Sequence, residues 1–194
     1  MPGVSTGTPR GGARERILHV ATHLLYTDGL GVGVDTIVAR CGVAKATLYT
    51  HFPSKDTLVR EVLERRDHEW RERVARAVEG AADPDARLLA VFDVLDEDTR
   101  RRDYRGSPHL NAVAELPDPA HPARRACAAH ATGLRGLLGR LASEAGAREP
   151  DELAGALALL VHGAACARVI EGDREAAPRA RRAAVTLLDA ERER

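Results

Sequence analysis

A short segment, 42–59 (GVAKATLYTHFPSKDTLV), gathers side chains that can hydrogen-bond to duplex DNA. The ammonium group of Lys45 can donate to guanine O6 or N7, and Thr47 and Thr50 can offer a methyl to thymine or a hydroxyl to a base. Phosphate contacts, which position a protein without reading sequence, suit the longer side chains nearby. The candidates for phosphate contacts are Tyr49, His51 and Lys55. The segment therefore predicts a surface for the major groove.

A short helix must carry these groups, and the sequence predicts it over 45–51. Gly42 permits the tight turn before it, and Pro53 ends it. A preceding helix over 34–41 would complete a helix-turn-helix, with Thr36 near its start in position for a phosphate. Val43, Leu48 and Phe52 are expected to point inward, and the residues that can face outward are Lys45, Ala46, Thr47, Thr50 and His51. An exposed helix with an apolar anchor is what the major groove accepts.

The rest of the chain predicts an all-α protein. Aromatic residues make up only 3% of it, and apolar residues recur three and four positions apart along most of its length. We expect a flexible arm over 1–13, a three-helix head over 14–60 and a larger helical body over 61–194. About nine helices are predicted, over 14–28, 34–41, 45–51, 55–79, 85–100, 109–116, from the proline-rich segment 117–122 to 145, 150–171 and 174–190.

Charge and cysteine content favour a cytoplasmic protein with DNA contacts confined to the head. The net charge is zero, but residues 1–60 hold seven cationic side chains against four anionic ones. Because this positive excess is small, one copy of the head would bind DNA weakly, and we expect a dimer on DNA. Three cysteines without a pairing pattern suit a reducing compartment. We expect no membrane span and no secretory signal, because unbroken apolar runs are short and the first residues are polar.

The body holds no motif that predicts an enzyme or a cofactor site. A phosphate-binding loop, a GxSxG turn and an HExxH helix are all absent from the sequence. Cys127 and His130 lie three apart and His162 and Cys166 four apart, so two packed helices could bring these four to zinc. Such side chains fill helix interfaces more often. A helical metal-binding protein or enzyme carrying this head stays as the alternative function.

Small residues dominate the last two predicted helices, which favours a dimer interface there. The helix over 150–171 is rich in alanine and glycine, and the one over 174–190 adds alanines and leucines. Small side chains let backbones approach closely, and a two-fold four-helix bundle would cover this apolar pair.

The head resembles that of the tetracycline-repressor (TetR-like) family over 14–63. The resemblance rests on Gly29, an Ile-Val-Ala-Arg helix, Gly42-Val43, Thr47-Leu48-Tyr49 and Phe52-Pro53-Ser54-Lys55. It implies that the DNA-contacting residues are Lys45, Ala46, Thr47, Tyr49, Thr50, His51 and Lys55. One departure is Ala44, where the family usually has a serine that caps the next helix. Its absence costs about 1 kcal/mol.

The resemblance also implies what the body does. Ser107–Arg124 is similar to one subgroup of the family, in which Ser107 is often cysteine. By resemblance, the body would be an effector-binding and dimerisation domain, and the protein a ligand-responsive homodimeric regulator, most simply a repressor released from a palindromic operator. The expected pocket residues are Trp70, Phe92, His109, Asn111, Glu115 and His130. The effector itself is not identified by these residues.

Overall fold

The computed structural model describes residues 12–193, so the arm predicted over 1–13 lies almost wholly outside the described residues. The described part contains nine α helices and no strand, which confirms the all-α prediction. The helices are α1 (Ala13–Thr27), α2 (Val34–Cys41), α3 (Lys45–His51), α4 (Lys55–Glu79), α5 (Pro84–Arg100), α6 (Pro108–Glu115), α7 (Pro122–Glu144), α8 (Pro150–Ile170) and α9 (Ala176–Glu193).

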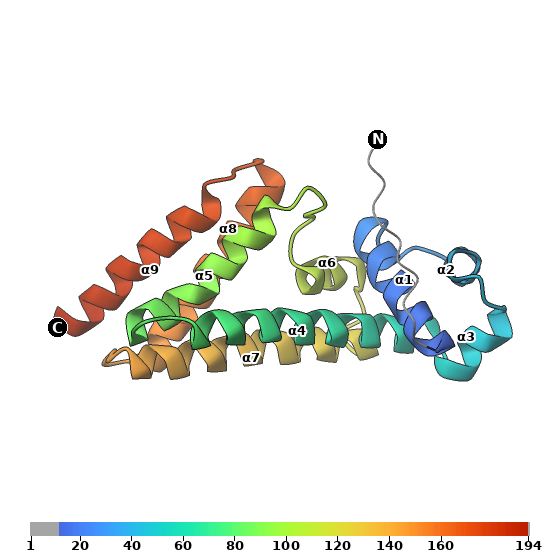
Figure 1. The fold of residues 1–194 in the computed structure, drawn as a ribbon, viewed down its shortest axis with the longest axis horizontal. Coiled ribbons are helices and arrows are strands. Elements are labelled where there is room, and N and C mark those ends of the chain that lie inside the picture. The colour runs from blue at the N-terminus through green and yellow to red at the C-terminus, as the bar shows by residue number, and fades with distance from the viewer. Residues whose placement is uncertain (1–11, 194) are drawn as a thin grey trace.

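Helices α1 to α3 form the head at one end of the molecule, around the start of α4 (Figure 1). Their apolar faces bury a compact core in which five large side chains have no solvent exposure: Ile17, Ile37, Leu48, Phe52 and Leu58. Burying each such side chain contributes roughly 1.5–3 kcal/mol. This core holds α2 and α3 in place while leaving their outer faces uncovered within the described residues.

Local backbone chemistry sets the angle between the helices of the head. Gly42 ends α2 in the left-handed conformation (φ 65°), which glycine adopts at little cost. Ala44 occupies the N-cap of α3 without a side-chain hydrogen bond, as its methyl group requires. Ser54, by contrast, caps α4 by accepting a hydrogen bond from the Thr57 amide at 3.1 Å. The start of α3 therefore lacks a side-chain cap, as do the glycine-capped starts of α1 and α2, whereas the start of α4 has one.

The body packs α4, α5, α7, α8 and α9 around a second core. Helices α4 and α7 run alongside each other, and α8 packs between α7 and α9 (Figure 1). The large side chains at the centre of this core are fully or almost fully buried: Phe92, Leu134, Leu138, Leu157 and Leu188. The short helix α6 lies between the head and these longer helices (Figure 1).

Helix α4 connects the two cores without a break. The domain boundary predicted at residue 60 falls inside this helix. Val62 and Leu63 pack in the head core, whereas Val74 belongs to the body core. A helix of 25 residues is stiff, so a displacement of its body half moves its head half.

Helix α8 is long and apolar enough, by length and composition alone, to cross a membrane, with a mean hydropathy of 1.8 over the tested window. His162 and Arg168 interrupt it, so its longest unbroken apolar run is Leu153–Val161, far short of the roughly 18 residues that span a membrane. Only 39% of that window is buried inside the chain. Leu159 and Ile170 are 73% and 80% exposed, so an uncovered apolar face remains on this helix.

Candidate functional site

The outer face of α3 carries the side chains that the sequence predicts for DNA contact. Tyr49 is 43% exposed, while Leu48 beside it is completely buried. Thr36, Lys45, Ala46 and Thr50 are exposed, and Thr47, His51 and Lys55 are partly exposed. The predicted division between an outward polar face and an inward anchor therefore holds in the structure, and α3 is available to a partner.

Two of these side chains already make contacts within the head. The Lys45 ammonium lies 2.8 Å from Asp35 of α2, and this hydrogen bond raises the pKa of Lys45. Both side chains are exposed, so Lys45 can exchange Asp35 for a base or phosphate at little cost. The Thr50 hydroxyl donates to the Ala46 carbonyl at 2.9 Å, which leaves its oxygen lone pairs and its methyl for contacts.

Two adjoining cavities lie where the head meets the body. The larger, of about 430 Å³, is bounded by α1, α4, α6 and the end of α8. The smaller, of about 250 Å³, is bounded mainly by α4, α5, α7, α8 and the start of α6. Four residues line both cavities: Tyr26, Arg66, Tyr104 and Pro108. A ligand placed at this junction would contact the head helix α1 and the body at once.

The predicted pocket residues divide between the two cavities. Trp70, His109 and His130 line the smaller one, and Asn111 and Glu115 the larger one. Phe92 lines neither, because its ring is fully buried in the body core against neighbouring helices. The prediction for Phe92 is therefore corrected to a packing role.

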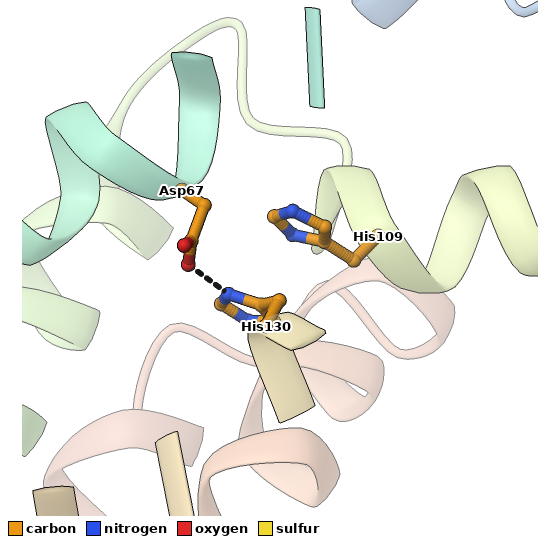
Figure 2. Close-up of side chains that lie close together, drawn as sticks. All are labelled: Asp67, His109 and His130. Carbon is orange, nitrogen blue, oxygen red and sulfur yellow. Dashed lines mark hydrogen bonds and ion pairs between the residues drawn. The ribbon is translucent and has the colours of Figure 1, made fainter. Parts of the chain in front are cut away.

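Asp67, His109 and His130 converge from three helices, α4, α6 and α7, and the two histidines line the smaller cavity (Figure 2). His130 Nδ1 lies 2.6 Å from an Asp67 carboxylate oxygen. The two imidazole rings stack with centroids 3.9 Å apart and planes 3° from parallel. His109 Nε2 also lies 3.3 Å from the Leu63 carbonyl, so each ring is held by a second contact.

The surroundings of this cluster keep His109 neutral and Asp67 charged. Burial, aided by His130, lowers the pKa of His109 to about 4, so His109 is neutral at physiological pH. Burial alone would raise the pKa of Asp67, but hydrogen bonds from His130 and Arg71 outweigh it and lower that pKa. Asp67 is thus a charged acceptor that orients His130.

The cluster does not have the geometry of a metal site. An imidazole nitrogen binds a metal ion through a lone pair that lies in the plane of its ring. The rings of His109 and His130 are stacked and parallel, so a single ion cannot lie in the planes of both. The four residues of the alternative zinc site do not gather either. Cys127 is buried in the head core, Cys166 is exposed and His162 lines the smaller cavity. Helices α7 and α8 do pack together, and His130 and His162 both line the smaller cavity, but neither Cys127 nor Cys166 lines it.

Arg66 is the main site residue that sequence reasoning missed. Its guanidinium donates to the Thr22 carbonyl at 3.2 Å and lies over the Tyr26 ring, 4.6 Å from its centroid. Its Nε is buried without a hydrogen-bond partner, and burial lowers the pKa of this side chain. A signal was present in the sequence: Arg66 falls in the four-residue spacing of Leu58, Val62, Trp70 and Val74, the inward stripe of α4.

Polar contacts tie the head to the segment around α6. The Tyr26 hydroxyl donates to the Gly106 carbonyl at 3.1 Å and accepts from the Arg105 amide at 2.7 Å. Glu115 accepts a hydrogen bond from the Leu30 amide at 2.7 Å. The walls of the larger cavity thus include the contacts that set the head against the body.

Comparisons with known proteins agree with this architecture. Residues 17–62 match the family model for bacterial regulatory proteins of the tetR family. The chain is 32% identical over 120 residues to the HTH-type transcriptional regulator LmrA of Bacillus subtilis, and the match covers 60% of this chain and 64% of LmrA. It is 30% identical over 119 residues to the HTH-type transcriptional activator FasR of Mycolicibacterium smegmatis, covering 56% of this chain and 54% of FasR. The chain thus matches less than two thirds of the length of these two curated relatives.

Solved structures extend the likeness to nearly the whole chain. The TetR-family transcriptional regulator SCO4454 from Streptomyces coelicolor is 33% identical with a TM-score of 0.86, and the match covers 92% of this chain and 95% of that one. A second structure, of the regulator sav143 from Streptomyces avermitilis, is also 33% identical, with a TM-score of 0.81 and coverage of 93% and 98%.

Proposed function

Because the chain belongs to the TetR family of bacterial transcriptional regulators, a non-enzymatic family that binds DNA, we propose that it is a homodimeric repressor released from a palindromic operator by a small-molecule effector. The observation that carries the proposal is the uncovered polar face of α3, held by the buried Leu48 and Phe52. Its site of action is the cytoplasm, where bacterial DNA lies.

The proposed DNA interface is the set of exposed side chains on α2, α3 and the start of α4. Lys45, Thr47 and Thr50 would contact base edges, and Thr36, Tyr49, His51 and Lys55 would contact phosphates, with Ala46 against the groove. Two such heads in a dimer would read half-sites about 34–36 Å apart. The small positive excess of the head makes this pairing necessary for tight binding.

The proposed dimer forms through α8 and α9. Support comes from the uncovered apolar face of α8, where Leu159, Val169 and Ile170 are half to four-fifths exposed. A face of this kind on a monomer marks an interaction surface. Pairing α8 and α9 with their copies would make a four-helix bundle, which also explains why α8 is apolar without being mostly buried.

The proposed effector site is the pair of cavities beside α4. An effector changes operator affinity only if it binds one spacing of the heads better than the other. The continuous α4 and the contacts of Tyr26 and Glu115 supply a route from these cavities to the head. For repression, the effector must favour the spacing that does not fit the operator. FasR, by contrast, is a transcriptional activator, so the match to it does not distinguish repression from activation. The change in operator affinity on effector binding tests which of the two applies here.

The test begins with DNA selected from a random duplex pool by the purified protein, followed by affinity measurements at fixed salt. Lys45→Ala should weaken binding by roughly tenfold to a hundredfold, because a base-contacting cation is lost. Tyr49→Phe should weaken it less, by roughly tenfold or below, through one hydroxyl. Arg140→Ala, an exposed cation change on α7, is the matched control and should leave affinity unchanged.

Sedimentation velocity on the same preparations checks the assembly. All variants should sediment as dimers, so that any loss of affinity reflects the α3 surface. A palindromic consensus is expected from the selection. Equal affinity of Lys45→Ala and the parent protein, or a monomer bound to an asymmetric site, would refute the proposed interface.

A further inference from the structure

The larger cavity has an unusual excess of cations without anionic partners. Three arginines line it, Arg66, Arg105 and Arg168, against a single carboxylate, that of Glu115. Within residues 12–193, none of these three guanidinium groups forms an ion pair. Each donates instead to a backbone carbonyl: Arg66 to Thr22, Arg105 to Tyr26 and Arg168 to Thr99. Glu115 is itself engaged by the Leu30 amide.

The arginines that line only the smaller cavity are paired with carboxylates, so among the arginines of the two cavities the unpaired ones are those that line the larger cavity. Arg73 and Arg101, which line only the smaller cavity, have carboxylate partners: Asp98 lies 2.7 Å from Arg73, and Asp103 lies 3.2 Å from Arg101. Arg66 has no carboxylate of its own, because the two that interact with it, Glu69 and Asp103, pair with Arg65 and Arg101. Burial of an unpaired guanidinium is costly, and Arg66 additionally keeps a buried Nε without a hydrogen-bond partner. A ligand that brings a negative charge would offset this cost.

The smaller cavity supplies the complementary apolar surface. Trp70, Leu95, Leu134 and Val161 line it, and it meets the larger cavity at Arg66. A ligand spanning the junction would have an anionic end beside Arg66 and an apolar part against Trp70. A planar guanidinium binds a carboxylate through two parallel hydrogen bonds, which gives direction as well as strength.

We propose that the effector is a small organic acid whose carboxylate pairs with Arg66 and whose apolar part lies against Trp70. This inference rests on the proposed function in taking the cavities as the effector site. The same contact would link effector binding to the position of the head. The Arg66 guanidinium already holds the α1 carbonyl of Thr22 and the Tyr26 ring. A carboxylate competes for the same donor group, so binding alters the contact between α4 and the head.

The experiment uses three acids as probes: benzoate, 4-phenylbutyrate and octanoate, each with its neutral amide. Trp70 is the only tryptophan of the chain, so its fluorescence reports directly on the smaller cavity, and calorimetry gives the affinity. At least one acid should bind more tightly than its amide. Arg66→Met should weaken that acid by roughly tenfold to a hundredfold, because charge-assisted hydrogen bonds are lost, and leave the amide unchanged.

Two further variants keep the test decisive. Arg66→Lys retains the charge but not the two-pronged geometry, so its affinity should fall between those of the parent protein and Arg66→Met. Arg76→Met, an exposed position on the same helix that lines neither cavity, should bind the acid normally. If Arg66→Met does not fold, the intermediate affinity of Arg66→Lys carries the same conclusion.

The inference is overturned if no acid binds below millimolar concentration, if acids and amides bind equally, or if Arg66→Lys binds like the parent protein. Operator affinity measured with and without the acid separates this result from the proposed function. An acid that binds through Arg66 without changing operator affinity supports the site and refutes its regulatory role. Operator binding without any acid binding refutes the inference and leaves the DNA-binding proposal intact.

Discussion

Acidification should destabilise the fold through His109, a buried imidazole at the junction of α4, α6 and α7. The titratable and charged groups that face it are His130 on α7 and Asp67 and Arg71 on α4. Burial lowers the pKa of His109 from 6.5 to about 4. Above about pH 6.5 the residue is neutral in both the folded and unfolded chains, so it adds no pH dependence there.

The direction and size of the change in the free energy of unfolding follow from proton uptake at His109. As the pH falls below 6.5, the unfolded chain binds a proton at this position before the folded protein does, so the free energy of unfolding falls until the pH reaches about 4. The full difference corresponds to about 3 kcal/mol, and about 2 kcal/mol of it is lost at about pH 5. Asp67, whose pKa is lowered, affects stability only at still lower pH.

Denaturant unfolding at fixed protein concentration, between neutral pH and about pH 4.5, measures this loss. His109→Phe keeps a planar ring against His130 but cannot take up a proton, so its stability should fall about 2 kcal/mol less than that of the parent protein. His19→Phe, at an exposed position on α1, makes the same exchange away from this cluster and, as the matched control, should keep the parent pH dependence. Identical pH dependence of His109→Phe and the parent protein would refute the reasoning.

Two further substitutions probe the head and its attachment. Ala44→Ser supplies the missing N-cap of α3 and should stabilise the protein by about 1 kcal/mol, read as a higher denaturant midpoint; an unchanged midpoint would mean that the serine makes no cap. Tyr26→Phe removes the hydroxyl that bonds to Gly106 and Arg105, and should cost about 1–3 kcal/mol and speed amide hydrogen exchange at Arg105; unchanged exchange would show that this contact does not hold the head.

The helix pattern was predictable because its signals are local. Gly42 and Pro53 bound the short α3, and prolines open α5, α6, α7 and α8, one residue before or at the predicted starts. The sequence pattern predicts a start of α9 at 174, but the helix begins at Ala176, with Pro178 inside its first turn. A helix that began at 174 would place Pro178 in its second turn, where the ring clashes with the carbonyl four residues earlier. The observed start keeps this proline in the first turn, where it is tolerated.

Which of the predicted pocket residues line a cavity, and which cavity they line, was not predictable from local signals. An apolar stripe on a helix shows which side faces inward, but not whether a neighbouring helix or a cavity lies opposite. Phe92 and Trp70 both look like core residues in sequence, yet only Trp70 borders a cavity. Whether His109 and His130 stack depends on the packing of α6 against α7, which brings together residues from separate helices.

The amino-acid sequence by itself determined an all-helical chain with an outward polar face on α3, since helix periodicity and glycine and proline signals act over a few residues. Only the tertiary structure decided which charges are paired. Arg66 lies in the inward stripe of α4, but whether a carboxylate from another helix meets it depends on long-range packing. Folding left that position without one, because the head helix α1 presents a carbonyl and an aromatic ring there.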